Sequence, residues 1–334
     1  MKICIAGFGS IGRRHLRNLL AIGEKDIVLF RTHQGTLPED EISNIPVETD
    51  FQKVLDQKPD ALFVANPTAL HMQVAIPAAK QGCHIFMEKP ISHELEQVKE
   101  LIAVSEASGA KTFVGFQFRF HPGLDMISNL LKENAIGQVV NFTCRWGEYL
   151  PAWHPWEDYR KSYTARKDLG GGVVNTLSHP LDYLAWLFGK VDAVQAYIQH
   201  ISPLELEVED TADAILQYEN GLSGTAHLDY LQRPPQHTLE IVGMEGTMRW
   251  NNADGHVQLY QVSKESWETL KIADNFDRNE LFLSEMHHFL SVCRGEVEPS
   301  CTLNDGILAQ QLALAIHKSS NEGRKVALSE ILTL

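Results

Sequence analysis

The stretch that decides the fold runs from Lys2 to Arg14 and reads KICIAGFGSIGRR. Residues 3–6 are an apolar run of the length of a buried strand, and residues 13–20 have the pattern of a helix. Between them, the glycine spacing lets the chain turn tightly, lets its backbone approach a pyrophosphate, and lets helix pack on strand. We therefore expect a dinucleotide site built from this turn. Its residues are Gly7, Phe8, Gly9, Ser10, Ile11 and Gly12.

The composition excludes several classes of partner. The chain has 334 residues, which is enough for two domains of ordinary size. Its net charge of −14 argues against nucleic acid and anionic membranes as partners. The five cysteines are scattered without metal-like spacing, so we expect reduced thiols, no metal site and a cytoplasmic location. No apolar run reaches the roughly 18 residues of a membrane span, and we expect neither a signal peptide nor a transmembrane segment.

The first half of the chain alternates short buried strands with helices. One of the helices is expected to begin after Ser92 as N-cap and to end at Gly109. This alternation predicts a Rossmann-type, doubly wound parallel sheet over residues 1–120. The expected strands cover residues 3–6, 26–30, 61–65, 84–87 and 112–115.

The second half, residues 121–334, changes to strict alternation of apolar and polar residues with tight turns. This pattern predicts an α+β domain with an open, mainly antiparallel sheet that has helices on one face. Two long helices, at about 279–293 and 305–319, come last and are able to pack back on the first domain. The other face of the sheet must be solvated or shared with a second subunit, so we expect a homodimer or homotetramer.

Two loops at the carboxyl edge of the parallel sheet are expected to hold the cofactor. After the second strand the chain has Arg31 and Thr32 where an acidic residue would bind the ribose of NAD. Because Arg31 would attract a 2′-phosphate, we expect NADP to be preferred over NAD. The alternative is that Arg31 stacks on adenine or faces solvent. Asn66, Pro67 and Thr68 follow the next buried strand at the same edge.

Lys89 is the first candidate catalytic residue. It follows a buried strand at the ligand-binding edge, with Glu88 before it and Pro90 after it. A lysine beside a nicotinamide can stabilise the negative charge that develops on a substrate oxygen. The alternative is an ordinary surface lysine in a loop.

His179 is the second candidate. An imidazole titrates near neutral pH and can take a hydroxyl proton as hydride leaves the same carbon. Asn175 lies four residues earlier and would share a face with His179 on a regular helix, although Pro180 removes one hydrogen bond of that helix. The alternative is that His179 only caps a helix or packs in the core.

Between these candidates lies a loop that is rich in aromatic and basic residues, in a chain that is acidic overall. Such a loop suits a flat or sugar-like substrate that carries negative charge, for example a sugar nucleotide. The alternative is a solvated loop with a few packing aromatics. The expected substrate contacts are Trp153, Arg160, Tyr163 and Arg166.

Together these motifs resemble the Gfo/Idh/MocA oxidoreductases in order and spacing, over essentially the whole chain. The resemblance implies binding of NAD(P) and oxidation or reduction of a hydroxyl on a sugar, sugar nucleotide or cyclitol. It implies that Lys89 contacts both cofactor and substrate and that His179 is the acid/base. It also implies that the loop at residues 66–68, His71 and Arg119 surround the cofactor, and that many members are dimers or tetramers.

One departure from the family pattern bears on the chemistry. The family usually has Asp where this chain has Asn175, and an amide can orient a histidine but cannot stabilise its charge. Two alternatives to an oxidoreductase therefore stay open. One is a dinucleotide-binding sensor without catalysis, and the other is a glycosidase of the same family that keeps its NAD bound.

Overall fold

The computed structural model describes residues 1–32 and 44–331. Within these ranges the first half of the chain forms sheet A, a parallel sheet of six strands in the order β3-β2-β1-β4-β5-β6. This is the doubly wound order expected from the alternation of strands and helices. The strands are β1 (Ile3–Ala6), β2 (Ile27–Phe30), β3 (Val47–Glu48), β4 (Ala61–Val64), β5 (His84–Met87) and β6 (Thr112–Val114).

Four helices accompany sheet A: α1 (Ser10–Ala21), α2 (Phe51–Asp56), α3 (His71–Lys80) and α4 (Val98–Ser108). Gly109 ends α4 in the left-handed conformation, as expected. The expected N-cap at Ser92 is wrong, because its hydroxyl accepts the N–H of Glu94 at 3.2 Å in a local turn and α4 begins later. Pro77 lies inside α3 without ending it.

The second half forms sheet B, which has nine strands among the described residues in the order β14-β13-β12-β11-β7-β10-β9-β8-β15. All neighbours pair antiparallel except β7 and β10, which run parallel, so the expected mainly antiparallel sheet is confirmed. The strands are β7 (Val139–Gly147), β8 (Val191–Gln199), β9 (Thr211–Tyr218), β10 (Ser223–Asp229), β11 (Gln236–Gly243), β12 (Gly246–Asn251), β13 (Val257–Gln261), β14 (Ser266–Leu270) and β15 (Val326–Ala327).

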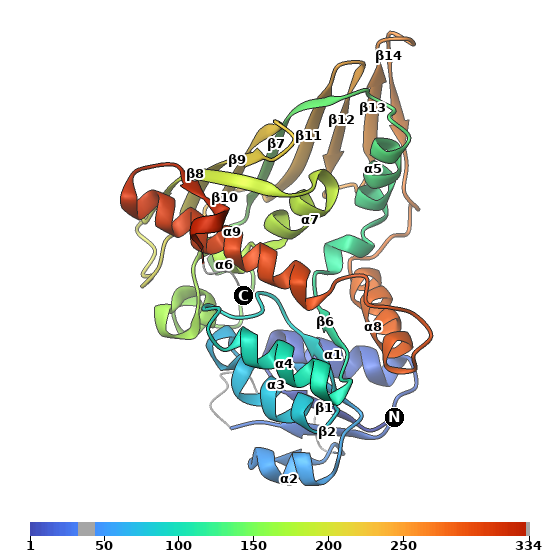
Figure 1. Cartoon of the computed structure of the whole chain (residues 1–334), viewed down its shortest axis with the longest axis vertical. Coiled ribbons are helices and arrows are strands. Elements are labelled where there is room, and N and C mark those ends of the chain that lie inside the picture. The colour runs from blue at the N-terminus through green and yellow to red at the C-terminus, as the bar shows by residue number, and fades with distance from the viewer. Residues whose placement is uncertain (33–43, 332–334) are drawn as a thin grey trace.

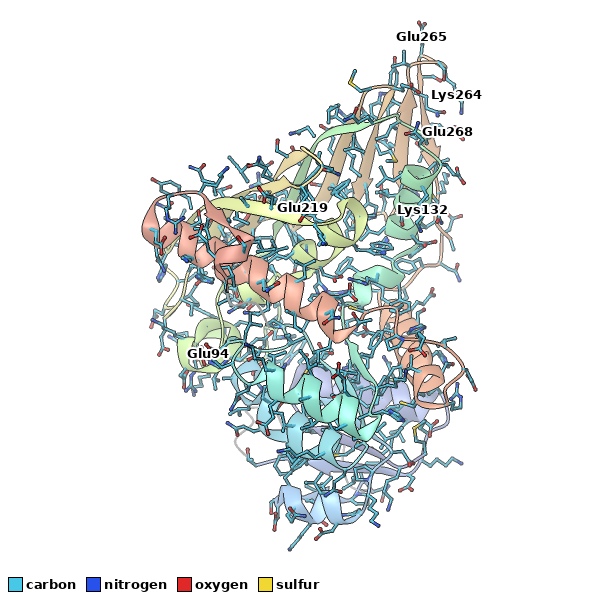
Figure 2. All side chains as sticks on the ribbon, in the orientation of Figure 1. Glu94, Lys132, Glu219, Lys264, Glu265 and Glu268 are labelled. Atoms are coloured by element: carbon cyan, nitrogen blue, oxygen red, sulfur yellow. The ribbon has the colours of Figure 1, made fainter. Side chains whose placement is uncertain are left out.

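Sheet B is covered by helices on one face, as Figure 1 shows. In β9, buried and exposed residues alternate, which is the pattern of a sheet with one face in the core. The edge strand β14 is almost wholly exposed, and charged side chains gather at its end: Lys264, Glu265 and Glu268 lie at the tip of the β13–β14 hairpin (Figure 2). Charges of this kind protect a free sheet edge from pairing with another chain.

Within residues 121–331 the helices of the second half are α5 (Pro122–Lys132), α6 (Val173–Thr176), α7 (His179–Phe188), α8 (Asn279–Cys293) and α9 (Leu303–Glu322). Helix α8 packs back on the first half, where Phe289 meets Phe63 edge-on with 5.3 Å between ring centroids. Helix α9 runs along β8, and its glycine Gly306 lies against Val114 of β6. The two last helices therefore join the sheets.

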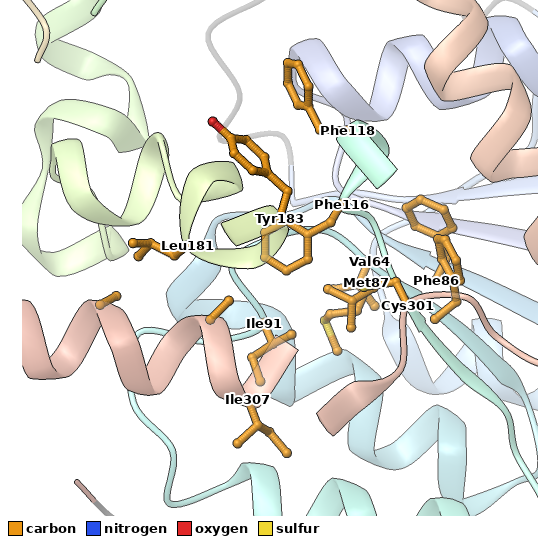
Figure 3. Close-up of a cluster of buried hydrophobic side chains, with 14 of the residues drawn as sticks. Val64, Phe86, Met87, Ile91, Phe116, Phe118, Leu181, Tyr183, Cys301 and Ile307 are labelled. Carbon is orange, nitrogen blue, oxygen red and sulfur yellow. The ribbon is translucent and has the colours of Figure 1, made fainter. Parts of the chain in front are cut away.

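A continuous apolar core fills the space between the two halves. Figure 3 shows Val64, Phe86 and Met87 of sheet A gathered with Leu181 and Tyr183 of α7 and with Ile307 of α9. All of these side chains are buried. Because the core is shared, the ends of the sheet A strands are held against α6 and α7, which is where the candidate residues lie.

Two expectations from the sequence, on the cysteines and on membrane-spanning helices, can be compared with the described residues. The five cysteines are free thiols, four of them buried. No helix within residues 1–32 and 44–331 has the length and apolar character needed to cross a membrane.

Candidate active site

The glycine turn after β1 has the geometry that its sequence predicts. Gly7 has a φ of +100°, and a Cβ there would lie 2.5 Å from the backbone nitrogen of Asn66. A Cβ on Gly12 would lie 2.2 Å from the carbonyl oxygen of Gly7. Gly9 instead faces open space and caps α1 without a side-chain hydrogen bond, so the first N–H groups of the helix are available to an anion. These features fit a dinucleotide pyrophosphate.

Two arginines flank the ring of Phe8 beside this turn. The guanidinium carbon of Arg13 lies 4.7 Å from the ring centroid, and that of Arg31 lies 5.6 Å from it. Both arginine side chains are buried, whereas Thr32 is exposed. Positive charge is thus concentrated at the end of β2, where the adenosine ribose of a dinucleotide lies in this fold.

The loop after β4 is tied to the segment that follows Lys89. The amide nitrogen of Asn66 donates to the carbonyl of Leu70 at 3.1 Å, and the amide oxygen of Asn66 is buried without a partner among the described residues. The two ring nitrogens of His71 face the backbone carbonyls of Asn66 and Ile91, at 3.0 and 3.3 Å, and the single N–H of the neutral ring donates to one of them. Burial lowers the pKa of His71 to about 4, so this histidine is neutral and positions the loop.

Glu88 points away from the sheet edge and pairs with His15 of α1, with 2.7 Å between the carboxylate and Nε2. Glu285 of α8 lies nearby and is fully buried, with neither carboxylate oxygen bonded to any described residue. Burial raises the pKa of Glu285 well above its usual value, and the charge of Glu88 adds to this shift. Its surroundings therefore favour the protonated form of Glu285.

The ammonium group of Lys89 connects the two halves of the molecule. Its Nζ donates a 2.7 Å hydrogen bond to the carbonyl oxygen of Thr176, the last residue of α6. Four residues later the chain has Pro180, which lacks the N–H that would bond this carbonyl in a continuous helix. The proline therefore leaves an acceptor that Lys89 uses.

The electrostatic surroundings of Lys89 favour loss of its proton. Burial lowers the pKa of Lys89 to about 8; the charge of Glu88 opposes this shift and that of Arg278 adds to it. At pH 7 the amine is still mostly protonated and donates hydrogen bonds. A proton donor that titrates near neutral pH is a mark of a functional site.

Aromatic rings enclose the imidazole of His179, the first residue of α7. Trp146 stacks against it with 5.5 Å between ring centroids, while Phe116 and Phe118 meet it edge-on at 5.6 and 5.0 Å. Burial lowers the pKa of His179 well below its usual value, and the charge of Lys89 lowers it further. His179 is therefore neutral at pH 7, which is the form that accepts a proton.

Asn175 and His179 do not share one helix, which corrects the expectation from their spacing. The chain breaks between α6 and α7, because Pro180 cannot continue the hydrogen bonding. The amide nitrogen of Asn175 instead approaches the carbonyls of Gly170 and Gly171, at 3.3 and 3.4 Å. Asn175 thus holds the glycine loop, and among the described side chains no hydrogen bond joins it to His179.

Arg119 lies on the 3-10 turn after β6 and binds acidic residues of the second half. Its guanidinium contacts Asp182 of α7 at 2.7 Å and Asp305 of α9 at 3.0 Å, and donates to the carbonyl of Ser300 at 2.8 Å. The arginine was expected beside the nicotinamide. In the structure its charge is already neutralised by these partners, and it joins the two halves.

The loop expected to bind substrate is divided between packing and solvent. The indole of Trp153 packs edge-on against the buried Tyr230, at 5.6 Å between centroids. Tyr163 lies near Glu88, and burial together with that charge raises the pKa of its hydroxyl. Arg160 and Arg166 are half-exposed and paired with Asp158 and Asp168, two residues away from each. Their charges are thus already paired.

Two features near the site were not predicted from the sequence. The carbonyl of Thr176 could have been found from the position of Pro180, four residues later. Arg278, just before α8, has no such signal in the sequence, because its position near the site depends on how the chain returns from sheet B to α1.

The glycine turn fits a pyrophosphate, Lys89 follows a strand of the same sheet, and the neutral His179 comes from the other half of the chain. This combination is that of an NAD(P)-dependent oxidoreductase. Comparison with known proteins agrees. The model described as "Oxidoreductase family, NAD-binding Rossmann fold" matches residues 1–116, and "Oxidoreductase family, C-terminal alpha/beta domain" matches residues 128–328. The chain belongs to the Gfo/Idh/MocA family, which confirms the resemblance seen in the sequence.

Relatives of known sequence span nearly the whole chain. An uncharacterised oxidoreductase of Bacillus subtilis is 28% identical, over 97% of this chain and 95% of that protein. Myo-inositol 2-dehydrogenase of Thermotoga maritima is 24% identical, over 99% of this chain and all of that protein.

Two solved structures have the same fold. Levoglucosan dehydrogenase in complex with NADH and levoglucosan has a TM-score of 0.86 at 20% identity, covering 98% of this chain and 99% of that one. The WlbA dehydrogenase of Bordetella pertussis in complex with NADH and UDP-GlcNAcA has a TM-score of 0.81 at 23% identity, covering 100% of this chain and 99% of that one.

Proposed function

We propose that this oxidoreductase transfers a hydride between a nicotinamide and a hydroxyl or carbonyl carbon of a sugar, sugar nucleotide or cyclitol. The observation that carries the proposal is that Lys89, a protonated amine, donates across the junction of the two halves to the carbonyl of Thr176, three residues before the neutral His179, whose pKa its charge lowers. The names of the relatives, which include dehydrogenases of inositol and of anhydro-sugars, support the substrate class.

In the oxidising direction His179 accepts the proton of the substrate hydroxyl, since its imidazole is neutral at working pH. Lys89 Nζ donates a hydrogen bond to the same oxygen and stabilises the negative charge that develops there. The rings of Phe116, Phe118 and Trp146 keep bulk water from the imidazole. When bound, the nicotinamide supplies the hydride acceptor or donor.

We further propose that NADP is preferred over NAD. Arg31 and Arg13 bring positive charge to the ring of Phe8 at the end of β2, and both would attract a 2′-phosphate. Directly after β2 the sequence has Arg31 and Thr32 at the place where a ribose-binding carboxylate would stand.

The test is spectrophotometric. Purified protein is mixed with NADP⁺ and a panel of sugars, cyclitols and sugar nucleotides, and the absorbance at the reduced-nicotinamide band is followed. We expect turnover with at least one substrate, loss of turnover in Lys89→Met and His179→Ala, and wild-type turnover in Lys111→Met, which removes an exposed lysine paired with Glu298. Normal turnover in both site variants would contradict the assignment, and the same assay with NAD⁺ tests the cofactor preference.

We also propose that the protein forms a homodimer or homotetramer through the outward face of sheet B, and that it works in the cytoplasm. On that face Tyr197 and Ile215 are 72% and 51% exposed, although apolar side chains of this size are usually covered. The five free thiols are typical of a protein in a reducing compartment.

A further inference from the structure

The segment between β14 and α8 leads the chain from sheet B back to α1, past the candidate active site. Phe276 meets His121 edge-on, with 5.3 Å between ring centroids. Asn279 then exchanges amide hydrogen bonds with Asn18 of α1, at 2.9 and 3.3 Å, and accepts a longer one from Arg14 at 3.4 Å. These two anchors hold Arg278 at the junction of the two halves, beside the helix that begins at the glycine turn.

Arg278 is exposed and, unlike Arg160 and Arg166, its guanidinium has no ion-pair partner among the described residues. Its side chain also makes no hydrogen bond within residues 1–32 and 44–331, and only its backbone carbonyl accepts one, from Leu281 at 3.3 Å. The neighbouring Asp277 uses its carboxylate to accept the N–H of Asn279 at 2.6 Å. By contrast, Arg160 and Arg166 are each paired with an acid two residues away.

The charge of Arg278 affects the pKa values of the groups that are proposed to react. After burial, it is among the causes that lower the pKa of Lys89, His179 and Arg14. Together with Arg14, it also contributes to lowering the pKa of His154. Cations that repel one another in a protein of net charge −14 raise the free energy of the empty site, and a bound anion relieves that repulsion.

We propose that Arg278, with Arg14 beside it, binds an anionic group of the substrate, a carboxylate or a phosphate, and so selects acidic sugars or sugar phosphates over neutral ones. The inference rests on the proposed function, because it places this group on the molecule that Lys89 and His179 act upon. A guanidinium suits the role, since its planar fork donates two parallel hydrogen bonds to a carboxylate or a phosphate. The phosphates of the cofactor share this chemistry and are the competing source of the anion.

The test measures binding to the complex of the protein with NADPH or NADH, whichever binds more tightly, through the fluorescence of the reduced nicotinamide. The probes are matched sets: glucose, glucuronate and glucose 1-phosphate, then N-acetylglucosamine and UDP-N-acetylglucosamine. In at least one set we expect the anionic member to bind the wild type about ten to a hundred times more tightly than the neutral one, as charged hydrogen bonds allow. Arg278→Gln should lose that difference, and Arg278→Lys should keep part of it.

Arg294→Gln is the matched control, because Arg294 flanks the other end of α8, is half-exposed and pairs with Glu296. It removes the same charge and should leave the preference unchanged. A second readout is the alkaline limb of the pH profile, which should move to higher pH in Arg278→Gln because the arginine lowers the pKa of Lys89.

Three outcomes separate the possibilities. Equal binding of neutral and anionic probes in every set, or an unchanged preference in Arg278→Gln, would overturn the inference. Weaker binding of the cofactor alone in Arg278→Gln would assign the arginine to the cofactor phosphates and would overturn it too. Failure of the wild type to bind both NADPH and NADH would contradict the proposed function itself.

Discussion

Lys89 and His179 must hold opposite protonation states to act together, and their environments arrange this. Lys89 has to be protonated to donate to a substrate oxygen, and its pKa is lowered to about 8, mainly by burial. His179 has to be neutral, and burial lowers its pKa well below 6.5. We therefore predict that kcat/KM is constant around pH 7, falls above about pH 8 as Lys89 loses its proton, and falls on the acid side only well below pH 6.5.

The rates are measured from pH 5 to 10 with the same substrate and cofactor. Lys89→Arg is the informative variant, because a guanidinium stays protonated throughout this range. We expect it to be slower than the wild type but to lack the alkaline limb. A wild-type profile that stays flat to pH 10, or a limb that persists in Lys89→Arg, would contradict the role given to Lys89.

At position 175 the structure favours the amide over the carboxylate that is usual in the family. Asn175 donates toward two backbone carbonyls of the glycine loop, and a carboxylate has no hydrogen to donate. We predict that Asn175→Asp lowers the free energy of unfolding by about 1–3 kcal/mol, the cost of leaving such partners unsatisfied. Denaturant unfolding measures this change in the free energy of unfolding. Asn141→Asp, an exposed amide that donates to the carbonyl of Ser223, is the control and should change stability little.

At the scale of elements, the break between α6 and α7 is what gives Lys89 its partner. Pro180→Ala would restore an N–H directed at the carbonyl of Thr176, in competition with Lys89 Nζ. We predict that kcat falls on the order of tenfold or more, because small displacements of a positioned group are costly, while NADPH binding is retained. Steady-state kinetics and a cofactor titration separate the two effects.

Pro77→Ala is the matched control for this prediction. Pro77 also lies in a helix, but α3 continues through it and no functional group uses the carbonyl four residues before it. Its kcat should equal that of the wild type. Equal kcat values in Pro180→Ala and the wild type would show that the carbonyl of Thr176 does not position Lys89.

The sequence predicts those elements whose signals are local. The glycine turn needs only its own spacing, and the alternation of residues in β9 is confirmed by its burial. The predicted start of α4 was wrong because the hydroxyl of Ser92 can either cap a helix or accept a hydrogen bond within a turn. In the structure it accepts the hydrogen bond of the turn. Contacts between distant residues, such as Lys89 with Thr176, are not encoded in any local pattern.

Charge partners were the least predictable part of the site. Arg160 and Arg166 have the composition of a substrate loop, but each finds an acid two residues away, and a short loop makes that pairing easier than a distant one. Arg119 pairs with Asp182 and Asp305, because α7 and α9 bring these carboxylates to the end of sheet A. Only the packed fold decides which cations remain for a ligand.

At the scale of the whole molecule, one surface remains uncovered. Helices occupy the inner face of sheet B, and its outward face carries Ile215 in the middle of β9. Ile215 is paired with Thr225 of β10 on one side and Gln195 of β8 on the other, so it lies inside the sheet and not at an edge. In a two-fold dimer this face would contact the same face of a second copy. One substitution at Ile215 would therefore change both sides of the interface.

We predict that Ile215→Lys weakens self-association about a hundredfold or more, because it buries two unpaired charges in a two-fold interface. Light scattering coupled to size-exclusion chromatography over a range of micromolar concentrations measures the mass. Val262→Lys is the control: Val262 is 58% exposed and follows β13 near the charged hairpin tip, so it should leave the mass unchanged. A wild type that elutes as a monomer, or an Ile215→Lys variant that keeps the wild-type mass, would exclude this face as the contact, and the exposed isoleucine would then need another explanation.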